Sequence, residues 1–228
     1  MIHIKKNSPP KKFLDFKLQN PYFHFDDMPS DVKNALRTSL LKEQGYLCAY
    51  CMSRINDEFD KVKIEHYNAR TLDNELDYKN LLAVCTGNLA GSDLERQHCD
   101  TKKGNTPLHI DPQNPNHIKQ ISYKSDGTIC AKNNVDFNND FNYTLNLNDE
   151  YGYLKINRER ALREIKNKLH TMIGDKNAIL DYCRKTLNFY TNPVDGKYSP
   201  YCGIIKMRRN TPSFSYGDIS RRFFFAKF

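Results

Sequence analysis

The chain has 228 residues, enough for one medium domain or a small domain with a helical extension. Lysine and arginine number 35 against 27 aspartates and glutamates, and the net charge of +8 favours a polyanionic partner, nucleic acid before a membrane surface. The sequence has no apolar run of about eighteen residues and no signal-peptide pattern, so we expect a cytoplasmic protein without a membrane-spanning segment. The basic residues are spread along the chain, which leaves solubility alone as the alternative explanation of the charge.

The N-terminal region predicts an arm followed by a helix. Residues 1–28 contain prolines and scattered aromatic side chains, from which we expect an irregular, extended arm that packs on the body. Ser30 is a residue type that caps helix N-termini, and apolar residues then recur at helical spacing from Val32 to Leu40. Gly45 is expected to end this helix.

A pair of cysteines comes next. Cys48 and Cys51 are separated by two residues, a spacing that places two sulfur atoms on one metal ion. Seven cysteines in a reducing compartment argue against a disulfide framework and for such a site.

The segment after this pair carries side chains suited to catalysis. Residues 61–65 alternate polar and apolar, which predicts a short strand that presents Glu65 and His66. The Glu65 carboxylate is a ligand type that Mg²⁺ prefers, and a neutral imidazole can take a proton from water. A polar loop is expected over 67–77, and Asn80 can hydrogen-bond across it and orient the strand. Residues 80–84 are expected to begin a helix or turn.

A second pair of cysteines completes the metal site. Cys85 and Cys99 are separated by 13 residues, so the intervening loop must bulge outward while its ends converge, at little cost from its length. The alternatives are that both are ordinary buried thiols, or that His98 is the fourth ligand. Asp100 and Lys103 follow on one predicted helical turn that Gly104 closes. The zinc would hold Glu65 and Asp100 near one cation, and Lys103 could meet a phosphate.

The second half of the chain predicts a hairpin and two helices. Residues 118–123 and 128–131 flank a turn-forming Lys-Ser-Asp-Gly sequence. An Asn/Asp-rich segment with interleaved aromatics covers 133–150. The helices are expected over 157–173, where Ile173 belongs to the apolar face and Gly174 ends the helix, and over 175–190. The tail, 198–228, mixes basic and aromatic residues.

Three cysteines stand apart from the metal pattern and are interpreted as core thiols: Cys130, Cys183 and Cys202. No repeat and no long linker is present. We therefore divide the chain into an N-terminal arm and helix (1–45), a zinc-bearing core (46–110), and a hairpin with helical support and partner-docking elements (111–228).

The order of these residues resembles the HNH, or ββα-metal, nuclease motif in its zinc-bearing form. The resemblance implies that His66 is the general base, that Asn80 braces the loop and that Glu65 is an acidic metal ligand. Asp100 matches the last motif position, where His or Asn is commoner, but it keeps a metal-binding oxygen. The implied fold is α+β, with a zinc-stapled ββα-metal core embedded in a mostly helical domain.

More narrowly, the chain resembles the HNH effectors of the Septu antiphage defence type, PtuB-like proteins that are also found beside retrons. The segments that carry the resemblance are Ile4-Lys5-Lys6, Pro9-Pro10, Leu47-Cys48-Ala49-Tyr50-Cys51, Ile64-Glu65-His66, Tyr78-Lys79-Asn80-Leu81, Cys99-Asp100-Thr101-Lys102-Lys103-Gly104, and Leu145-Asn146-Leu147-Asn148 before Arg158. The family implies a role in phage defence with an SMC/ABC-like ATPase subunit (PtuA-like), and beside retrons with a reverse transcriptase and its DNA–RNA product.

From these features we expect a metal-dependent endonuclease that cuts nucleic acid, DNA first. Structural Zn²⁺ would bind Cys48, Cys51, Cys85 and Cys99, and catalytic Mg²⁺ or Mn²⁺ would bind the two carboxylates. Three alternatives stay open at this point. The chain could be a zinc-stapled module that binds nucleic acid without cutting, a nuclease that acts on structured RNA such as tRNA, or an interaction subunit whose helices dock a partner.

Overall fold

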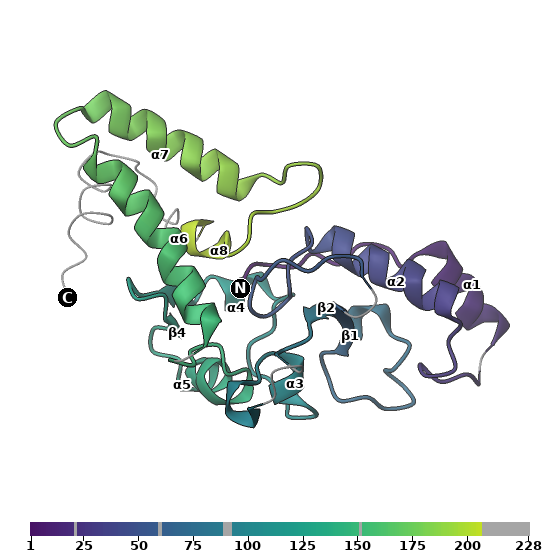
Figure 1. Cartoon of the computed structure of the whole chain (residues 1–228). Helices are drawn as coiled ribbons and strands as arrows, with labels where there is room; N and C mark the ends of the chain where they lie inside the picture. Colours follow the sequence, from purple (N-terminus) through teal and green to yellow (C-terminus); the bar gives the residue numbers. More distant parts are fainter. Residues whose placement is uncertain (21, 59–60, 89–92, 151, 207–228) are drawn as a thin grey trace.

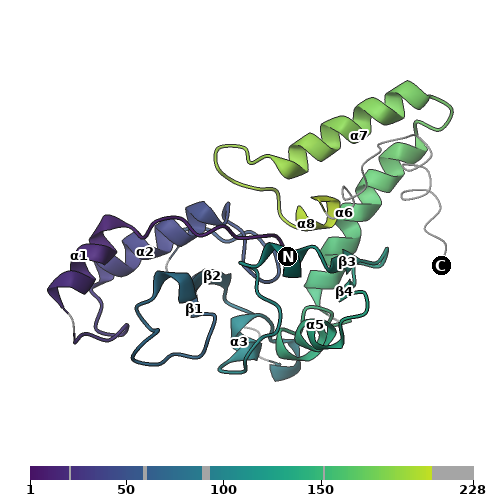
Figure 2. The ribbon, with the colours of Figure 1, turned by 180° about the vertical axis from the view of Figure 1, so that it is seen from behind.

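A computed structural model describes residues 1–20, 22–58, 61–88, 93–150 and 152–206. Their helices and strands are α1 Lys11–Gln19, α2 Ser30–Glu43, β1 Val62–His66, β2 Leu81–Cys85, α3 Asp100–Lys103, α4 Pro115–Ile118, β3 Ile121–Tyr123, β4 Ile129–Ala131, α5 Val135–Asn139, α6 Tyr153–His170, α7 Lys176–Thr191 and α8 Gly203–Lys206. The β1–β2 hairpin lies near the middle, with α1 and α2 at one end and the α6–α7 pair projecting from the other (Figures 1 and 2). Mixed helices and small antiparallel sheets agree with the predicted α+β class.

The expectation of an irregular arm over 1–28 was wrong for helix α1. Phe13 and Phe16 lie three residues apart on one helical face, and both are buried. The ring of Phe13 packs against that of Tyr78 with 6.4 Å between centroids. A nine-residue helix is marginal on its own, so packing of these two rings stabilises it more than its local sequence does.

The predicted helix from Ser30 is confirmed as α2, which ends at Glu43, and Gly45 follows with a φ of +59°. Between them, the buried side chain of Gln44 donates to the carbonyls of Leu47 and Ala83, at 2.9 and 2.7 Å. It also accepts from the backbone N–H of Ala83 at 2.8 Å. This one amide therefore fastens the end of α2, and the cysteine turn that follows it, to strand β2.

Strand β1 is confirmed, but the expectation of a helix or turn over 80–84 was wrong. A single 3₁₀ turn, Tyr78–Asn80, leads into β2, which pairs antiparallel with β1 and places Leu81 opposite His66 and Cys85 opposite Val62. All five residues of β2 are buried. In a short apolar run without alternation, the sequence pattern cannot distinguish a buried strand from a buried helix. Here the run is a strand, because it pairs with β1 inside the core.

The predicted C-terminal elements are confirmed with two corrections. Strands β3 and β4 form the expected hairpin, and α6 and α7 form the two expected helices. Ile173 lies beyond the end of α6 and is 67% exposed, so it does not belong to the apolar face. Cys183 and Cys202 are buried, as expected for core thiols, whereas Cys130 on β4 is only half-buried, so the expectation was wrong for that residue. Among the described residues, no helix combines the length and the apolar character needed to cross a bilayer.

Arg158 of α6 connects the helix to the hairpin. Its guanidinium is buried and donates to the carbonyls of Gly127 and Leu147, each at 2.6 Å. Arg158→Ala is expected to lower the free energy of unfolding by about 3 kcal/mol, because two carbonyl groups lose a charged donor. Urea denaturation measures this change.

The control for that experiment is Arg163→Ala on the same helix. The Arg163 side chain is 56% exposed and pairs with Glu159 at 3.2 Å. Exposed pairs of this kind contribute about 0.5 kcal/mol or less. Equal effects of the two substitutions would contradict the anchoring role of Arg158.

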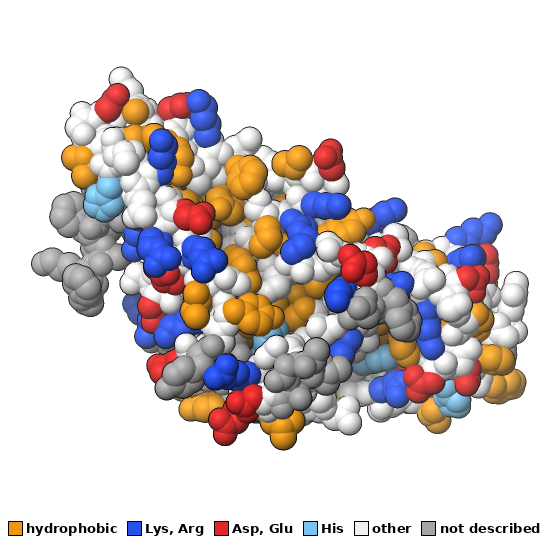
Figure 3. Space-filling view, in the orientation of Figure 1, with side chains coloured by type: hydrophobic (Ala, Val, Ile, Leu, Met, Phe, Trp, Pro, Cys, Tyr) orange, Lys and Arg blue, Asp and Glu red, His pale blue; other side chains and the backbone are white. Residues whose placement is uncertain are grey.

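The charged side chains form no single basic face on the side shown in Figure 3. There, Lys and Arg are interspersed with Asp and Glu, and hydrophobic side chains gather near the middle. The basic and aromatic part of the predicted tail, 207–228, lies outside the described residues.

Candidate functional site

Four buried cysteines from three segments meet beside the β1–β2 hairpin. Cys48 and Cys51 lie in the turn after α2, Cys85 ends β2, and Cys99 directly precedes α3. All four sulfur atoms lie within 4.8 Å of one another, with 3.9 Å between Cys48 and Cys99 and 3.8 Å between Cys51 and Cys85. These separations fit a tetrahedron with metal–sulfur bonds of about 2.3 Å. The predicted cysteine cluster is therefore present and could hold a zinc ion.

The pKa values of these thiols are shifted in opposite directions. Burial and the neighbouring thiols raise the pKa of Cys99 well above its ordinary value. Burial opposes ionisation of Cys51 as well, but hydrogen bonds with the other three thiols lower its pKa. Cys51 therefore ionises more readily than Cys85 and Cys99, whose pKa values are raised. A bound Zn²⁺ would supply the positive charge that lets all four act as thiolates.

Backbone contacts bring the segments of the cluster together. The loop after β2 closes where the N–H of His98 donates to the carbonyl of Gly87 at 3.1 Å. Gly87 has a φ of +63°, and a Cβ there would lie 2.2 Å from the His98 oxygen, so this closure requires glycine. Residues 89–92 of the loop lie outside the described residues. On the other side, the N–H of Ala49 donates to the carbonyl of Ala83 at 3.1 Å and ties the cysteine turn to β2.

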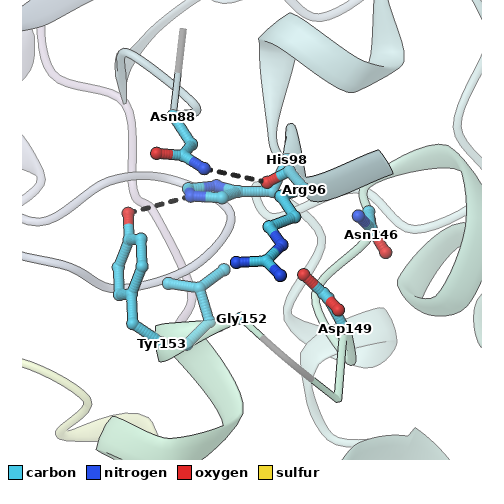
Figure 4. A pocket seen from close by; sticks show the side chains of 8 residues that line it. Asn88, Arg96, His98, Asn146, Asp149, Gly152 and Tyr153 are labelled. Carbon is cyan, nitrogen blue, oxygen red and sulfur yellow. Dashed lines mark hydrogen bonds between the residues drawn. The ribbon is translucent and has the colours of Figure 1, made fainter. Parts of the chain in front are cut away.

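His98, the alternative ligand, stands beside the cluster. Its Nδ1 lies 3.2 Å from the sulfur of Cys99 and 3.9 Å from that of Cys85. Its Nε2 lies 2.9 Å from the hydroxyl of Tyr153 at the start of α6 (Figure 4). This ring borders a cavity of about 260 Å³ that Arg96 also lines. Because four sulfur atoms already converge, His98 fits a hydrogen-bonding neighbour of the thiolates better than a fifth ligand.

A second group of side chains lies where β1 meets α3. Glu65 is buried, and its Oε1 lies 2.8 Å from the ammonium of Lys103 and accepts from the hydroxyl of Tyr50 at 3.2 Å. Asp100, at the first position of α3, accepts from Lys63 at 3.2 Å. Lys63 and Glu65 are two residues apart in a strand, so both reach α3 from the same face of β1.

The two carboxyl groups interact directly. Burial, followed by a hydrogen bond to Asp100, raises the pKa of Glu65 to about 8. Burial also opposes ionisation of Asp100, but the hydrogen bond with Glu65 and the charge of Lys63 lower its pKa. A carboxyl pair that shares a proton in this way offers oxygen ligands to a hard divalent cation, which would displace the proton.

Lys103 is buried, whereas its predicted role, contact with a substrate phosphate, implies an accessible ammonium group. Its side chain is 1% exposed and donates to the carbonyls of His66 and Gly104, at 3.4 and 3.2 Å, in addition to the contact with Glu65. In this structure it therefore supports the Glu65 carboxylate. A contact between Lys103 and a substrate phosphate stays a prediction.

His66 is held in one orientation. Its Nε2 lies 3.0 Å from the backbone carbonyl of Glu75. Because a carbonyl oxygen only accepts, Nε2 carries the hydrogen and Nδ1 keeps its lone pair. Phe25 packs edge-on against the imidazole with 4.7 Å between ring centroids. Burial lowers the pKa of His66, which favours the neutral form that can accept a proton.

Asn80 braces the loop that carries the partner of His66. Its side-chain oxygen accepts from the N–H of Asn68 at 2.8 Å, and its amide donates to the carbonyls of Asn68 and Asn74, at 3.1 and 3.4 Å. Asn80 is 4% exposed, so these bonds are shielded from water. They fix both ends of the polar loop between β1 and β2.

The side chains of Glu65, His66 and Asp100 line one cavity of about 280 Å³. Phe25 and Arg70 line it as well, and sequence reasoning missed both. Phe25 belongs to the segment expected to be an irregular arm, and Arg70 to the loop expected to be merely polar. No local pattern distinguishes them, because their positions depend on how the N-terminal segment folds back onto the β1–β2 loop.

The chain is similar in sequence to three curated proteins. It is 30% identical over 118 residues to “Retron Ec83 putative HNH endonuclease” of Escherichia coli, a match that covers 45% of this chain and 46% of the relative. It is 26% identical over 148 residues to “Septu protein PtuB” of Bacillus thuringiensis, covering 60% and 53%. It is 26% identical over 139 residues to “Retron Vc95 putative HNH endonuclease” of Vibrio cholerae, covering 57% and 65%.

The resemblance to HNH endonucleases of the retron and Septu type is confirmed by these relatives. The chain spans between 46% and 65% of the lengths of the three proteins it matches. No family model matches it.

Proposed function

We propose that this chain is a metal-dependent endonuclease that hydrolyses phosphodiester bonds of nucleic acid, with DNA as the first candidate. The observation that carries the proposal is the shared cavity of Glu65, His66 and Asp100, which combines two cation ligands with a neutral base. The order β1, β2, α3 with His66, Asn80 and Asp100 along it supports an HNH, or ββα-metal, core. The names of the related proteins support the same class of activity.

The proposed mechanism uses each side chain for one task. His66 takes a proton from the attacking water through Nδ1, while Nε2 stays bonded to the Glu75 carbonyl 3.0 Å away. Glu65 and Asp100 hold the catalytic Mg²⁺ or Mn²⁺. When bound, that ion neutralises charge that develops on the scissile phosphate and on the leaving oxygen. Lys103 keeps the Glu65 carboxylate in position before the ion binds.

The cysteine cluster has a structural task in this proposal. Zn²⁺ on the four sulfurs joins the turn after α2, the end of β2 and the start of α3. Asp100 follows the ligand Cys99 directly, and β2 pairs with the strand that bears Glu65. The cluster therefore fixes the distance between the two carboxylates without taking part in the reaction.

Cleavage of defined substrates tests the proposal. Purified protein would be incubated with duplex DNA, single-stranded DNA and tRNA, with Mg²⁺ or with EDTA. The proposal expects Mg²⁺-dependent cleavage of at least one DNA substrate. Cleavage of tRNA alone would favour the structured-RNA alternative, and binding without any cleavage would favour the non-catalytic module.

A partner belongs to the same proposal. We expect the chain to act with an SMC/ABC-like ATPase, and in a retron setting with the reverse transcriptase and its DNA–RNA product, as the effector of an antiphage defence complex. Helices α6 and α7 project from the body (Figure 1), and Ile156 and Phe189 on them are 47% and 54% exposed. Exposed apolar side chains on projecting helices suit a docking role. Cleavage of phage DNA in cells that lack any such ATPase would contradict the dependence on a partner.

A further inference from the structure

Arg70 lies at the boundary between two adjoining hollows. It lines the cavity of about 280 Å³ that contains Glu65, His66 and Asp100. It also lines a more open hollow of about 380 Å³ on its other side, together with His24. A strand of nucleic acid that leaves the first cavity in this direction must pass the Arg70 guanidinium.

The guanidinium is held in place by the N-terminal segment. Its Nη1 donates to Oδ2 of Asp26 at 2.9 Å, and its central carbon lies 6.0 Å from the centroid of the Phe25 ring. Phe25 in turn packs on the imidazole of His66. Asp26 and Phe25 of the N-terminal segment thus orient the guanidinium, and Phe25 also contacts the proposed base.

Charge distinguishes Arg70 from the other groups of the cavity. Among the described residues that line it, Arg70 is the one lysine or arginine, and the carboxyl groups of Glu65 and Asp100 line the same cavity. A phosphodiester carries a full negative charge and approaches such carboxylates only with cationic help. A guanidinium is always protonated and matches phosphate oxygens with two parallel hydrogen bonds.

We infer that Arg70 binds a backbone phosphate next to the scissile one, where the strand passes from the catalytic cavity into the adjoining hollow. This inference rests on the proposed nuclease function, since it names a contact with that substrate. The ion pair between Arg70 and Asp26 does not prevent phosphate binding, because both side chains are accessible to solvent: that of Asp26 is 74% exposed and that of Arg70 42%. An exposed ion pair contributes little stability and is readily replaced by a phosphate contact.

The experiment measures nucleic-acid binding apart from cleavage. Arg70→Ala and Arg70→Lys would be made in a His66→Ala background. Binding of labelled duplex and single-stranded DNA would be followed by fluorescence anisotropy without added Mg²⁺, over a range of salt. Loss of one phosphate contact reduces the slope of log Kd against log salt by about 0.9 for duplex and about 0.7 for single strands. Arg70→Ala is expected to show this reduction, whereas Arg70→Lys, which keeps the charge, is expected to retain the slope.

The matched control is Arg163→Ala, which removes another exposed, ion-paired arginine on the projecting helix α6. It is expected to leave the slope unchanged. Equal slopes for Arg70→Ala and Arg163→Ala, or no binding of DNA by the His66→Ala protein, would overturn the inference. A reduced slope in a protein whose wild type never cleaves would instead support the contact and refute the proposed nuclease function. Circular dichroism melting shows whether the Arg70 variants are folded. If the alanine variant is not, Arg70→Gln, which removes the charge but keeps a polar side chain, is expected to show the same reduction in slope.

Discussion

Cys85→Ser is expected to abolish stoichiometric zinc binding and to unfold the region 46–104. The Cys85 sulfur lies 3.8 Å from that of Cys51 inside a buried cluster, so a hydroxyl in its place leaves three thiols and an incomplete tetrahedron. Structural zinc contributes about 10–16 kcal/mol to folding in small zinc domains. A loss of that size exceeds the total stability of most domains, so the effect should be unfolding and not merely slower catalysis.

Elemental analysis and thermal melting of the purified variant measure this effect. Cys130→Ser is the matched control, because Cys130 is a half-buried thiol on β4 that lies outside the cluster. It is expected to keep both the zinc content and the melting temperature. Wild-type protein without stoichiometric zinc, or Cys85→Ser with unchanged zinc, would contradict the structural role of the cluster.

His66→Ala is expected to reduce cleavage by about 10²–10⁴-fold, the usual contribution of a general base. Folding and zinc content should stay intact, because the side chain is only half-buried, hydrogen-bonds to the Glu75 carbonyl and packs edge-on against Phe25. The loss should therefore appear in the rate of cleavage and not in the melting curve. Single-turnover cleavage rates with saturating Mg²⁺ measure it.

His3→Ala is the control for this substitution. His3 is exposed and bonds to the carbonyl of Gln113 at 3.1 Å, far along the chain from the proposed site. Its removal should leave the cleavage rate within a factor of two or so. A His66→Ala protein that cuts as fast as wild type would refute the assignment of the base and favour the non-catalytic binding module.

The metal-ligand pattern was predictable from sequence because two cysteines separated by two residues, followed by a second pair, are typical of zinc sites. Four cysteines and the Glu65-His66 pair therefore indicated a site before any fold was known. The strand β1 and the helical turn of α3 were also predictable, since alternation and a closing Gly104 are local signals.

Features that depend on distant packing were not predictable. Strand β2 was expected to be a helix or turn because its apolar run lacks a period, and helix α1 was missed because only Phe13 and Phe16 anchor it. Lys103, which could meet a phosphate according to the sequence, is buried against Glu65 in this structure, a contact that no local pattern indicates. Phe25 and Arg70 reach the cavity because the N-terminal segment packs against the loop between β1 and β2. No local sequence pattern in either segment predicts that contact.

The most direct test of the account is the cleavage rate as a function of Mg²⁺ concentration for the wild type and for Asp100→Ala. Asp100 is the first residue of α3 and interacts with Glu65, so its substitution would remove a proposed cation ligand and leave the proposed base, His66, in place. Asp136→Ala serves as the control, because Asp136 is an exposed acid in the first turn of α5. The account predicts saturable Mg²⁺ dependence for wild type and Asp136→Ala, and a shift to much higher Mg²⁺ for Asp100→Ala. Cleavage that is independent of Mg²⁺, or identical Mg²⁺ curves for the wild type and Asp100→Ala, would contradict it.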